Sequence, residues 1–463
     1  MLPRRFHRER RKRKRCTKKI TGMKQLGKHI RLPEFSVARW GFVTGVLVYT
    51  IFLYVSYVYF ISPHFDYLGF VYRPESVFVL VVAEVLSLIP SFWTPIRLKR
   101  PSQIVYLLLY LWAIVPSFMG WAFMGVLSLG KIVIFGSIIC VCLYLIRCIY
   151  FFRTLKARKL VSNESSFWFL FFGIATILYS IITYRQGINV EIPSIREVYL
   201  QREEFRRALG GIGAYFFNWL AKALNPFLIA WGYINKNILL VALGILGQVF
   251  LFSMSGLKSV LFSFLLLAAI AFALRNKGKN FSNYIVWSLV ALIAITSTLD
   301  YSLGVNIFSS LFVRRLLFVP GQNMSYYFDF FSNKPNTFFS HSFFGIVSDN
   351  PYGSNPSNLI GDIYGPPSPD IDVSANANLW ADGYASFGIF GIFLFSAVLS
   401  AIMWISDSFS AKKYRSISVL ILAYPAYMLT NTKLQTTFLT HGLGVVLLLL
   451  YLLPPGRTPK DES

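Results

Sequence analysis

Long apolar segments recur along the whole chain, and they leave few folds open to it. A helix needs roughly 20 mostly apolar residues to cross the hydrocarbon core of a bilayer. Twelve segments of the 463-residue sequence are candidate spans: residues 41–61, 77–92, 103–119, 131–149, 167–184, 212–232, 237–252, 259–274, 283–299, 384–405, 416–430 and 437–453. The pattern predicts an all-α polytopic integral membrane protein with about 12 transmembrane helices.

The composition agrees with this prediction. Hydrophobic residues make up 55% of the chain and charged residues only 14%, whereas soluble domains carry about a quarter of charged residues. The chain is therefore too apolar for a soluble protein. It contains no P-loop, G-x-S-x-G, HExxH or Rossmann fingerprint, so ATP-driven transport and standard hydrolase chemistry have no support.

Lysine and arginine residues fall in alternate loops, which indicates how the spans are oriented. Cytoplasmic loops retain positive charge during insertion. The groups that share one side are the N-terminal tail, residues 97–100, 147–159, 275–279 and 412–415, Lys236, and the C-terminal tail. Both termini are therefore predicted to be cytoplasmic. The first apolar segment is long enough to stay in the membrane as an anchor, and no cleavable signal peptide is expected.

The predicted organisation has five parts. They are a basic cytoplasmic tail at 1–40, spans one to nine at 41–299 with a short Arg-rich exported segment at 185–211, a large exported loop at 300–383, spans ten to twelve at 384–453, and a cytoplasmic tail at 454–463. Inside the loop, residues 350–372 are rich in Pro, Gly and Asn and are predicted to be coil with turns. The true start could be Met1 or Met23.

The formal net charge of +25 would suggest a nucleic acid partner for a soluble protein. Here the topology signals and the tail account for most of it, including the basic run from Arg10 to Arg15. Such a tail is attracted to anionic headgroups by about 1 kcal/mol per residue near the surface. Membrane lipid is thus the expected partner, and no nucleic acid is expected.

Few side chains within the predicted spans are suited to chemistry. Glu84 is the one ionisable side chain deep in the first five spans; it could be a proton relay or a hydrogen-bonded packing residue. Three cysteines lie in an apolar span with no nearby His, and a fourth lies in the tail: Cys140, Cys142, Cys148 and Cys16. Neither a disulfide framework nor a metal site is predicted from them.

Cationic side chains gather at three exported places, each beside the end of a span. They are the Arg-rich segment with Arg196 and Arg202, the turn that holds Lys258, and the pair Arg314 and Arg315. Arginine donates two parallel hydrogen bonds to phosphate and keeps its charge, so converging clusters could hold a lipid diphosphate without a metal. The alternatives without a ligand are an interfacial helix at residues 195–209 and a snorkelling lysine.

The exported loop also carries candidate catalytic and glycan-binding residues. Activation of a sugar hydroxyl needs a general base, and His341, Asp329 and Asp382 are candidates, although each could be a plain hydrogen-bonding residue. Aromatic side chains in the loop fit either stacking on saccharides or packing. Asp370 and Asp372 form a DxD, which can hold Mg or Mn against phosphate. A lone DxD is a weak signal, and no metal or other cofactor is expected.

Two stretches of the loop resemble a known family. The first is Arg314-Arg315 with Pro320-Gly321 and Tyr326-Tyr327-Phe328, and the second is Asn376-Ala377-Asn378-x-x-Ala381-Asp382-Gly383-Tyr384, continuing to Gly391. Together with Ile195-Arg196-Glu197-x-Tyr199 and Ser255-Gly256-x-Lys258-Ser259, they make the chain similar to the bacterial O-antigen and oligosaccharide repeat-unit polymerases of the Wzy type. The likeness is strongest from residue 195 to residue 391, and the first five spans match only in being hydrophobic.

The resemblance implies a metal-independent glycosyltransferase of the bacterial inner membrane whose active site faces the periplasm. Such an enzyme moves a growing glycan from undecaprenyl diphosphate to an incoming lipid-linked repeat unit, and a chain-length regulator protein is an expected partner. Diphosphate binding falls on Arg196, Arg314, Arg315, Arg202 and Lys258, and catalysis on His341, Asp382 and Asp329. Glycan binding falls on Tyr326, Tyr327, Asn376, Asn378 and Trp380.

Two rival functions remain open. An O-antigen ligase would share the fold, the donor and the phosphate chemistry. A lipid-linked oligosaccharide flippase or secondary transporter would share the plan of twelve spans with both ends inside. Transporters place charges and broken helices at mid-membrane, whereas polar residues here gather in one exported loop and Glu84 is almost alone inside the spans. This distribution favours catalysis at the interface.

Overall fold

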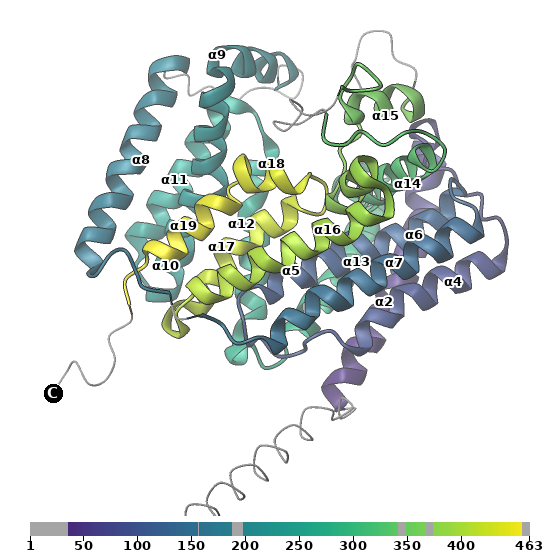
Figure 1. The fold of residues 1–463 in the computed structure, drawn as a ribbon, viewed down its shortest axis with the longest axis horizontal. Helices are drawn as coiled ribbons and strands as arrows, with labels where there is room; N and C mark the ends of the chain where they lie inside the picture. The colour runs from purple at the N-terminus through teal and green to yellow at the C-terminus, as the bar shows by residue number, and fades with distance from the viewer. Residues whose placement is uncertain (1–35, 156, 188–197, 341–348, 367–373, 456–463) are drawn as a thin grey trace, which may run out of the picture. The chain divides into compact units, whose positions relative to one another are not determined.

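The computed structural model describes residues 36–155, 157–187, 198–340, 349–366 and 374–455. These residues form helices and connecting turns, and no strand occurs among them. Contacts divide the chain into two units, residues 1–40 and 41–463. The helices of the second unit are shown in Figure 1.

Among the residues that the structure describes, seven helices are long and apolar enough to cross a membrane. They are Val37–Leu68, which begins with α2 (Val37–Ser56), Gln103–Met124, which includes α5 (Gln103–Leu108) and α6 (Val115–Met124), α7 (Leu129–Cys148), α8 (Glu164–Gln186), α11 (Ile238–Ser255), α13 (Phe281–Leu303) and α16 (Leu379–Phe409). This is the architecture of a polytopic membrane protein, and the predicted helical membrane class is confirmed.

The remaining predicted spans are also helical, but shorter or interrupted. They contain α4 (Val77–Leu88), the second half of α9 (Val198–Trp219) with α10 (Asn225–Asn235), α12 (Lys258–Ala273), α17 (Arg415–Met428), and α18 (Leu434–Leu439) with α19 (Leu443–Leu452). Within α9 the backbone is non-helical at Gly210, with φ of 64°. The helix predicted for the Arg-rich segment is confirmed from Val198 up to this kink.

Short polar residues and glycines mark where the long helices begin and end. Asn163 accepts from Ser166 N at 2.7 Å at the start of α8, and Asn237 accepts from Leu240 N at 3.2 Å at the start of α11. Such side chains satisfy amide groups that the first helical turn leaves without a partner. At the other end of α11, Gly256 takes a positive φ of 61°, a conformation that glycine adopts without strain.

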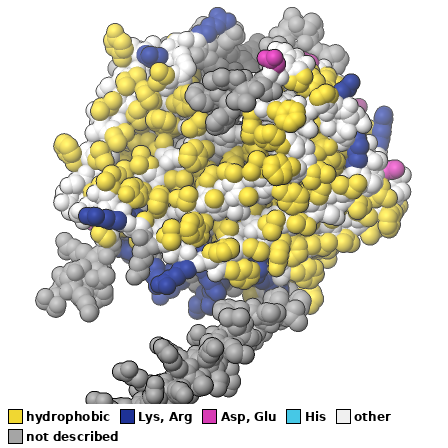
Figure 2. Space-filling view, viewed as in Figure 1, with side chains coloured by type: hydrophobic (Ala, Val, Ile, Leu, Met, Phe, Trp, Pro, Cys, Tyr) yellow, Lys and Arg dark blue, Asp and Glu magenta, His cyan; other side chains and the backbone are white. Residues whose placement is uncertain are grey.

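The surface of the helices suits a lipid environment. Figure 2 shows hydrophobic side chains over most of the visible face, with Lys and Arg side chains along its edges. Phe169 on α8 is 85% exposed and Leu246 on α11 is 64% exposed. Soluble proteins rarely expose continuous apolar surface, so these helices are membrane-embedded.

Basic loops meet at one end of the helices, called here the basic end. Leu98 N donates to Gly278 O at 2.9 Å, and Trp404 Nε1 donates to Arg153 O at 3.1 Å. Lys159 Nζ donates to Phe409 O at 2.5 Å and to Leu450 O at 2.6 Å. These contacts bring the basic loops at residues 97–100, 147–159 and 275–279 together, and their cytoplasmic location stays a prediction.

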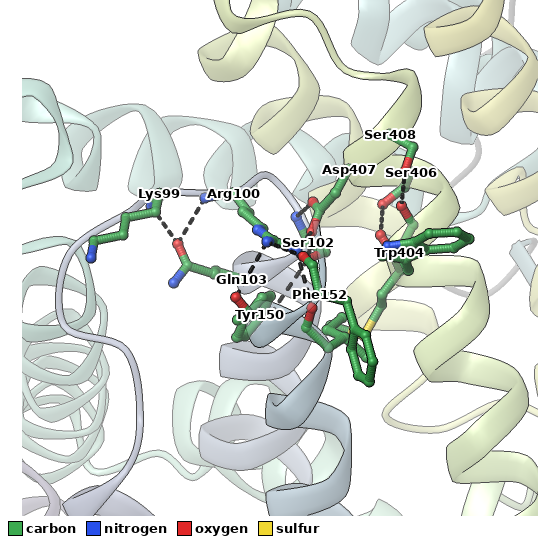
Figure 3. A network of polar contacts seen from close by, with 12 residues as sticks. Lys99, Arg100, Ser102, Gln103, Tyr150, Phe152, Trp404, Ser406, Asp407 and Ser408 are labelled. Atoms are coloured by element: carbon green, nitrogen blue, oxygen red, sulfur yellow. Dashed lines mark hydrogen bonds and ion pairs between the residues drawn. The ribbon is translucent and has the colours of Figure 1, made fainter. Parts of the chain in front are cut away.

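A buried carboxylate organises the basic end (Figure 3). Asp407 accepts from Ser102 N at 2.9 Å and from Ser102 Oγ at 2.8 Å, and Arg100 Nη1 lies 3.8 Å from its Oδ2. Arg100 also donates to the carbonyl oxygens of Ile149, Tyr150 and Phe152. The network joins the start of α5, the turn after α7 and the end of α16.

The opposite end, called the loop end, differs from the prediction. Residues 300–383 were expected to form a polar exported loop, but Ser309–Phe318 is a π-helix, η8, and Val319–Phe331 is the α-helix α14. Most of α14 is buried against α6 and α16. The coil predicted at 350–372 is also wrong in part, since Pro356–Tyr364 forms α15. Sequence polarity indicated solvent, whereas these polar residues are buried in protein.

Candidate functional site

Arg314 is the central residue of the candidate site at the loop end. It lies in η8 and is 7% exposed. Its guanidinium carbon lies 4.3 Å from the ring centre of Phe65 and 5.7 Å from that of Phe70, which is the range of a cation–π contact. Nε and Nη2 donate to Ser310 Oγ at 3.2 and 2.8 Å. Among the described residues, no carboxylate lies within ion-pair distance of Arg314.

Burial lowers the pKa of Arg314 to about 10, with a further decrease from Arg315 and an opposing effect of Tyr67. The side chain therefore still carries its charge at neutral pH, but the charge costs free energy where it is. Arg315, next to it, is exposed. An anion that reached Arg314 would meet a fixed donor with unused hydrogen-bonding capacity.

The backbone around Arg314 is irregular in three elements that meet. η8 packs against η1 (Tyr57–Ile61), the π-helical continuation of α2, and against η4 (Leu109–Ile114), the π-helical junction of α5 and α6. The Tyr57 and Phe318 rings lie 5.0 Å apart at this junction. Single π-helical turns occur often at functional sites, and nothing in the residue pattern predicted them.

The two stretches that carry the family resemblance pack against each other. Asn323 Nδ2 donates to Asn376 O at 3.0 Å, and Tyr327 OH donates to Ala375 O at 3.1 Å. Asn378 caps α16, with its Oδ1 accepting from Trp380 N at 3.1 Å and from Ala381 N at 3.0 Å. The side chains of Asn323 and Tyr327 thus hold α14 to the residues just before α16, and Asn378 fixes the start of α16.

The predicted glycan-binding residues are mostly buried. Trp380 and Tyr327 are fully buried, and Trp380 Nε1 donates to Ser396 Oγ at 3.0 Å. Tyr326 is 8% exposed and stacks on Tyr364 with ring centres 4.6 Å apart. In this conformation these rings offer little face for a sugar. Asn376 is exposed.

Two of the predicted catalytic carboxylates have protein partners. Asp329 Oδ1 lies 2.7 Å from Lys131 Nζ, and its Oδ2 accepts from Tyr364 OH at 2.8 Å. These contacts tie α14 to α7 and α15, and the Asp329 carboxylate raises the pKa of Tyr364 in addition to the larger effect of burial. Asp382 is fully buried, with Lys433 Nζ 3.5 Å from its Oδ1.

The surroundings of Asp382 also explain the glycines in its motif. The helix bends at Phe387 and Gly388, where Gly388 has φ of 61°. The residues before the bend then pack closely on those after it, so a Cβ on Gly383 would lie 2.7 Å from Gly391 O. Asp382 therefore lies in the first part of α16, before the bend and close to the residues after it. Helix α16 begins at Leu379, five residues before the span predicted at 384–405.

Part of the predicted site lies outside the described residues. Arg196 and His341 fall there, as do Asp370 and Asp372 of the DxD. Arg202 lies in α9 and Lys258 is the first residue of α12, and for both only the backbone is described. The predicted convergence of the three cationic clusters stays a prediction.

Sequence reasoning missed polar groups within the spans. Glu84 accepts from Thr50 Oγ1 at 2.9 Å, in agreement with the packing alternative. It is not almost alone, however, because Lys222 is 8% exposed and its Nζ lies 2.6 Å from His441 Nδ1. Both residues fall inside predicted spans, so the signal that singled out Glu84 was available for them. Lys433, the partner of Asp382, was also not singled out.

Comparison with known proteins gives no relative: no family model matches the chain, and no curated protein or solved structure matches it. Fold and site define it as a helical membrane protein with a buried arginine at the loop end.

Proposed function

We propose that this protein is a membrane glycosyltransferase of the O-antigen or oligosaccharide repeat-unit polymerase type. It transfers a growing glycan from undecaprenyl diphosphate to an incoming lipid-linked repeat unit without a metal. In this proposal the chain crosses the bacterial inner membrane twelve times, both termini are cytoplasmic, and the loop end faces the periplasm.

The observation that carries the proposal is the state of Arg314. A buried charge without a partner destabilises a protein, yet here a guanidinium is held by two aromatic rings and one hydroxyl group. Such a side chain is prepared for an anion, because binding supplies the missing counter-charge. A diphosphate leaving group, whose charge grows as the sugar bond breaks, would be stabilised more in the transition state than in the substrate.

The described geometry favours some of the predicted roles over others. Asp329 is engaged by Lys131 and Tyr364, and Asp382 is buried beside Lys433. Both therefore support the positions of helices, and His341 is the proposed base. Arg315 is exposed next to Arg314 and is proposed as the second contact to the diphosphate.

The test uses purified protein in nanodiscs, a lipid-linked repeat unit and EDTA. The wild type should produce a ladder of longer glycans. Arg314→Ala should slow the ladder by about 10- to 100-fold, since a hydrogen bond to a charged group contributes about 1.5–3 kcal/mol. Arg314→Lys should recover little, because lysine lacks the planar fork. Arg73→Ala, at an exposed arginine, is the matched control. An unchanged ladder in folded Arg314→Ala would remove this residue from the site.

A flippase or transporter of lipid-linked oligosaccharide is a second candidate. It is favoured by the buried Lys222 and by the interruption between α18 and α19, because transporters build sites at broken helices. Movement of a fluorescent lipid-linked glycan across proteoliposomes, with no ladder, would support this function. A ligase would instead transfer one glycan to a different acceptor lipid.

A further inference from the structure

The last apolar segment is two helices with a break between them. α18 ends at Leu439, and α19 begins at Leu443 after Gly442, which has φ of 85°. Thr440 and His441 lie in the break. No side chain caps the start of α19, so the amide groups of its first turn are directed into the break without a side-chain acceptor. A helix start of this kind carries partial positive charge.

A lysine from another span faces this break. Lys222 lies in the π-helix η6 (Leu220–Leu224), and its Nζ donates to His441 Nδ1 at 2.6 Å. A hydrogen bond fixes the arrangement, since Trp219 Nε1 donates to Leu439 O at 2.7 Å. Gly442 also lies close to the backbone of Lys222, because a Cβ added to Gly442 would be 3.6 Å from the Lys222 carbonyl carbon. The lysine and the break are thus held together within the membrane-embedded part.

The charges around Lys222 do not balance. Among the described residues, His441 is its one hydrogen-bond acceptor, and no carboxylate lies within ion-pair distance. A lysine has three donors, so two of them have no acceptor in this part of the chain. The positive start of α19 adds to the same sign of charge. The described residues supply no counter-charge for a protonated Lys222, so an anion that entered here would stabilise its charged form.

An apolar groove passes the same break. Its volume is about 440 Å³, and it lies between α8, the end of α9, η6, α18 and α19. Apolar side chains and one glycine line it. Trp219 and Leu224 in the lining lie within three residues of Lys222, and Leu439 and Gly444 lie within three residues of His441. Leu448, also in the lining, is 50% exposed, so a lipid can approach from the side.

We propose that Lys222 and the start of α19 bind the phosphate of a lipid monophosphate whose hydrocarbon chain lies in this groove. The lining fits a hydrocarbon chain, and the head of the site fits a phosphate because both of its features are positive. This site uses other helices than Arg314 does, and it does not depend on the proposed transferase activity.

The test measures binding by the full-length protein in nanodiscs of zwitterionic lipid. The probes are a polyprenyl monophosphate, the alcohol of the same chain length and inorganic phosphate, and the signals are tryptophan fluorescence, to which Trp219 in the groove contributes, and thermal unfolding. The monophosphate should bind at least about 10-fold more tightly than the alcohol, as loss of a hydrogen bond to a charged group costs about 1.5–3 kcal/mol. Lys222→Met should abolish the difference in affinity between monophosphate and alcohol. Lys236→Met, at the exposed lysine that follows the last residue of α10, should keep that difference.

A second variant tests the contribution of the hydrocarbon chain separately from that of the phosphate, and it does not depend on the folding of Lys222→Met. Leu448→Trp narrows the groove from its exposed side, and should weaken the monophosphate at least several-fold without changing the binding of inorganic phosphate. Arg314→Ala should bind the monophosphate normally, so failure of the transferase proposal would leave this result intact. Equal binding of monophosphate and alcohol by the wild type overturns the inference, as does tight monophosphate binding by folded Lys222→Met. Binding of inorganic phosphate alone would also refute the lipid site.

Discussion

Removing the carboxylate of Asp407 should destabilise the whole helical assembly. The side chain of Asp407 is 1% exposed and accepts two hydrogen bonds from Ser102. In Asp407→Ala, Ser102 N loses its acceptor in a buried place, and Ser102 Oγ keeps only the long contact to Tyr150 OH at 3.5 Å. An unsatisfied buried donor costs about 1–3 kcal/mol, so the expected loss is at least about 1–3 kcal/mol and at most about 6 kcal/mol if the Tyr150 contact contributes nothing.

Arg100 should add little to this loss. Its Nη1 is 3.8 Å from Asp407, and it keeps three carbonyl acceptors from the turn after α7. Asp407→Asn retains one acceptor oxygen and should lose only about 1–3 kcal/mol. Combining Asp407→Ala with Ser102→Ala removes one of the orphaned donors, and the double variant should be more stable than the sum of the single effects predicts.

The measurement is the unfolding of purified protein in mild detergent, followed by tryptophan fluorescence. The free energy of unfolding should fall in the order wild type, Asp407→Asn, Asp407→Ala. Ser406→Ala is the control, because in the described part of the chain its hydroxyl donates within its own helix, to Met403 O. The reasoning would be refuted by an Asp407→Ala protein as stable as the wild type, or by additive losses in the double variant.

Two further predictions concern packing and pH. Gly391→Ala should destabilise the protein by about 1–3 kcal/mol or more, because the new Cβ would overlap Gly383 O. Gly173→Ala, with open space around it in α8, should stabilise the protein by about 1 kcal/mol. Equal unfolding temperatures for the two variants would contradict the close packing of Gly383 on Gly391. Burial lowers the pKa of Lys159 to about 8 from its ordinary 10.5, so the unfolded chain binds more protons between these values, and the free energy of unfolding should rise with pH across that window. Lys159→Met should lack this rise in a pH series of unfolding curves.

The helical membrane class could be predicted from the sequence because hydropathy reports directly on lipid-facing segments. The gathering of basic loops followed from charge alone, and their contacts at Leu98 and Gly278 agree with it. α14 was missed because its polar residues, such as Gln322 and Asn323, are buried in protein, and hydropathy cannot separate that environment from water. For the same reason the polar loop looked more open to substrate than it is.

The candidate site was predicted less completely. Arg314 was predicted because arginine binds phosphate, and the structure adds that its charge is buried against aromatic rings. The π-helical turns depend on tertiary packing and leave no local pattern. Lys222 and His441 lie far apart in the chain, so their pairing appears only when the spans are assembled.

The interruption in the final segment has a consequence for biosynthesis. Insertion machinery recognises apolar stretches of about 20 residues, whereas α18 has 6 helical residues and α19 has 10. Neither piece is long enough to enter the bilayer unaided. The C-terminal pass therefore depends on earlier helices to receive it, among them α9, whose Trp219 donates to Leu439 O. An internal deletion of α8 and α9 that keeps the C-terminal segment should leave α18 and α19 exposed to quality-control proteases.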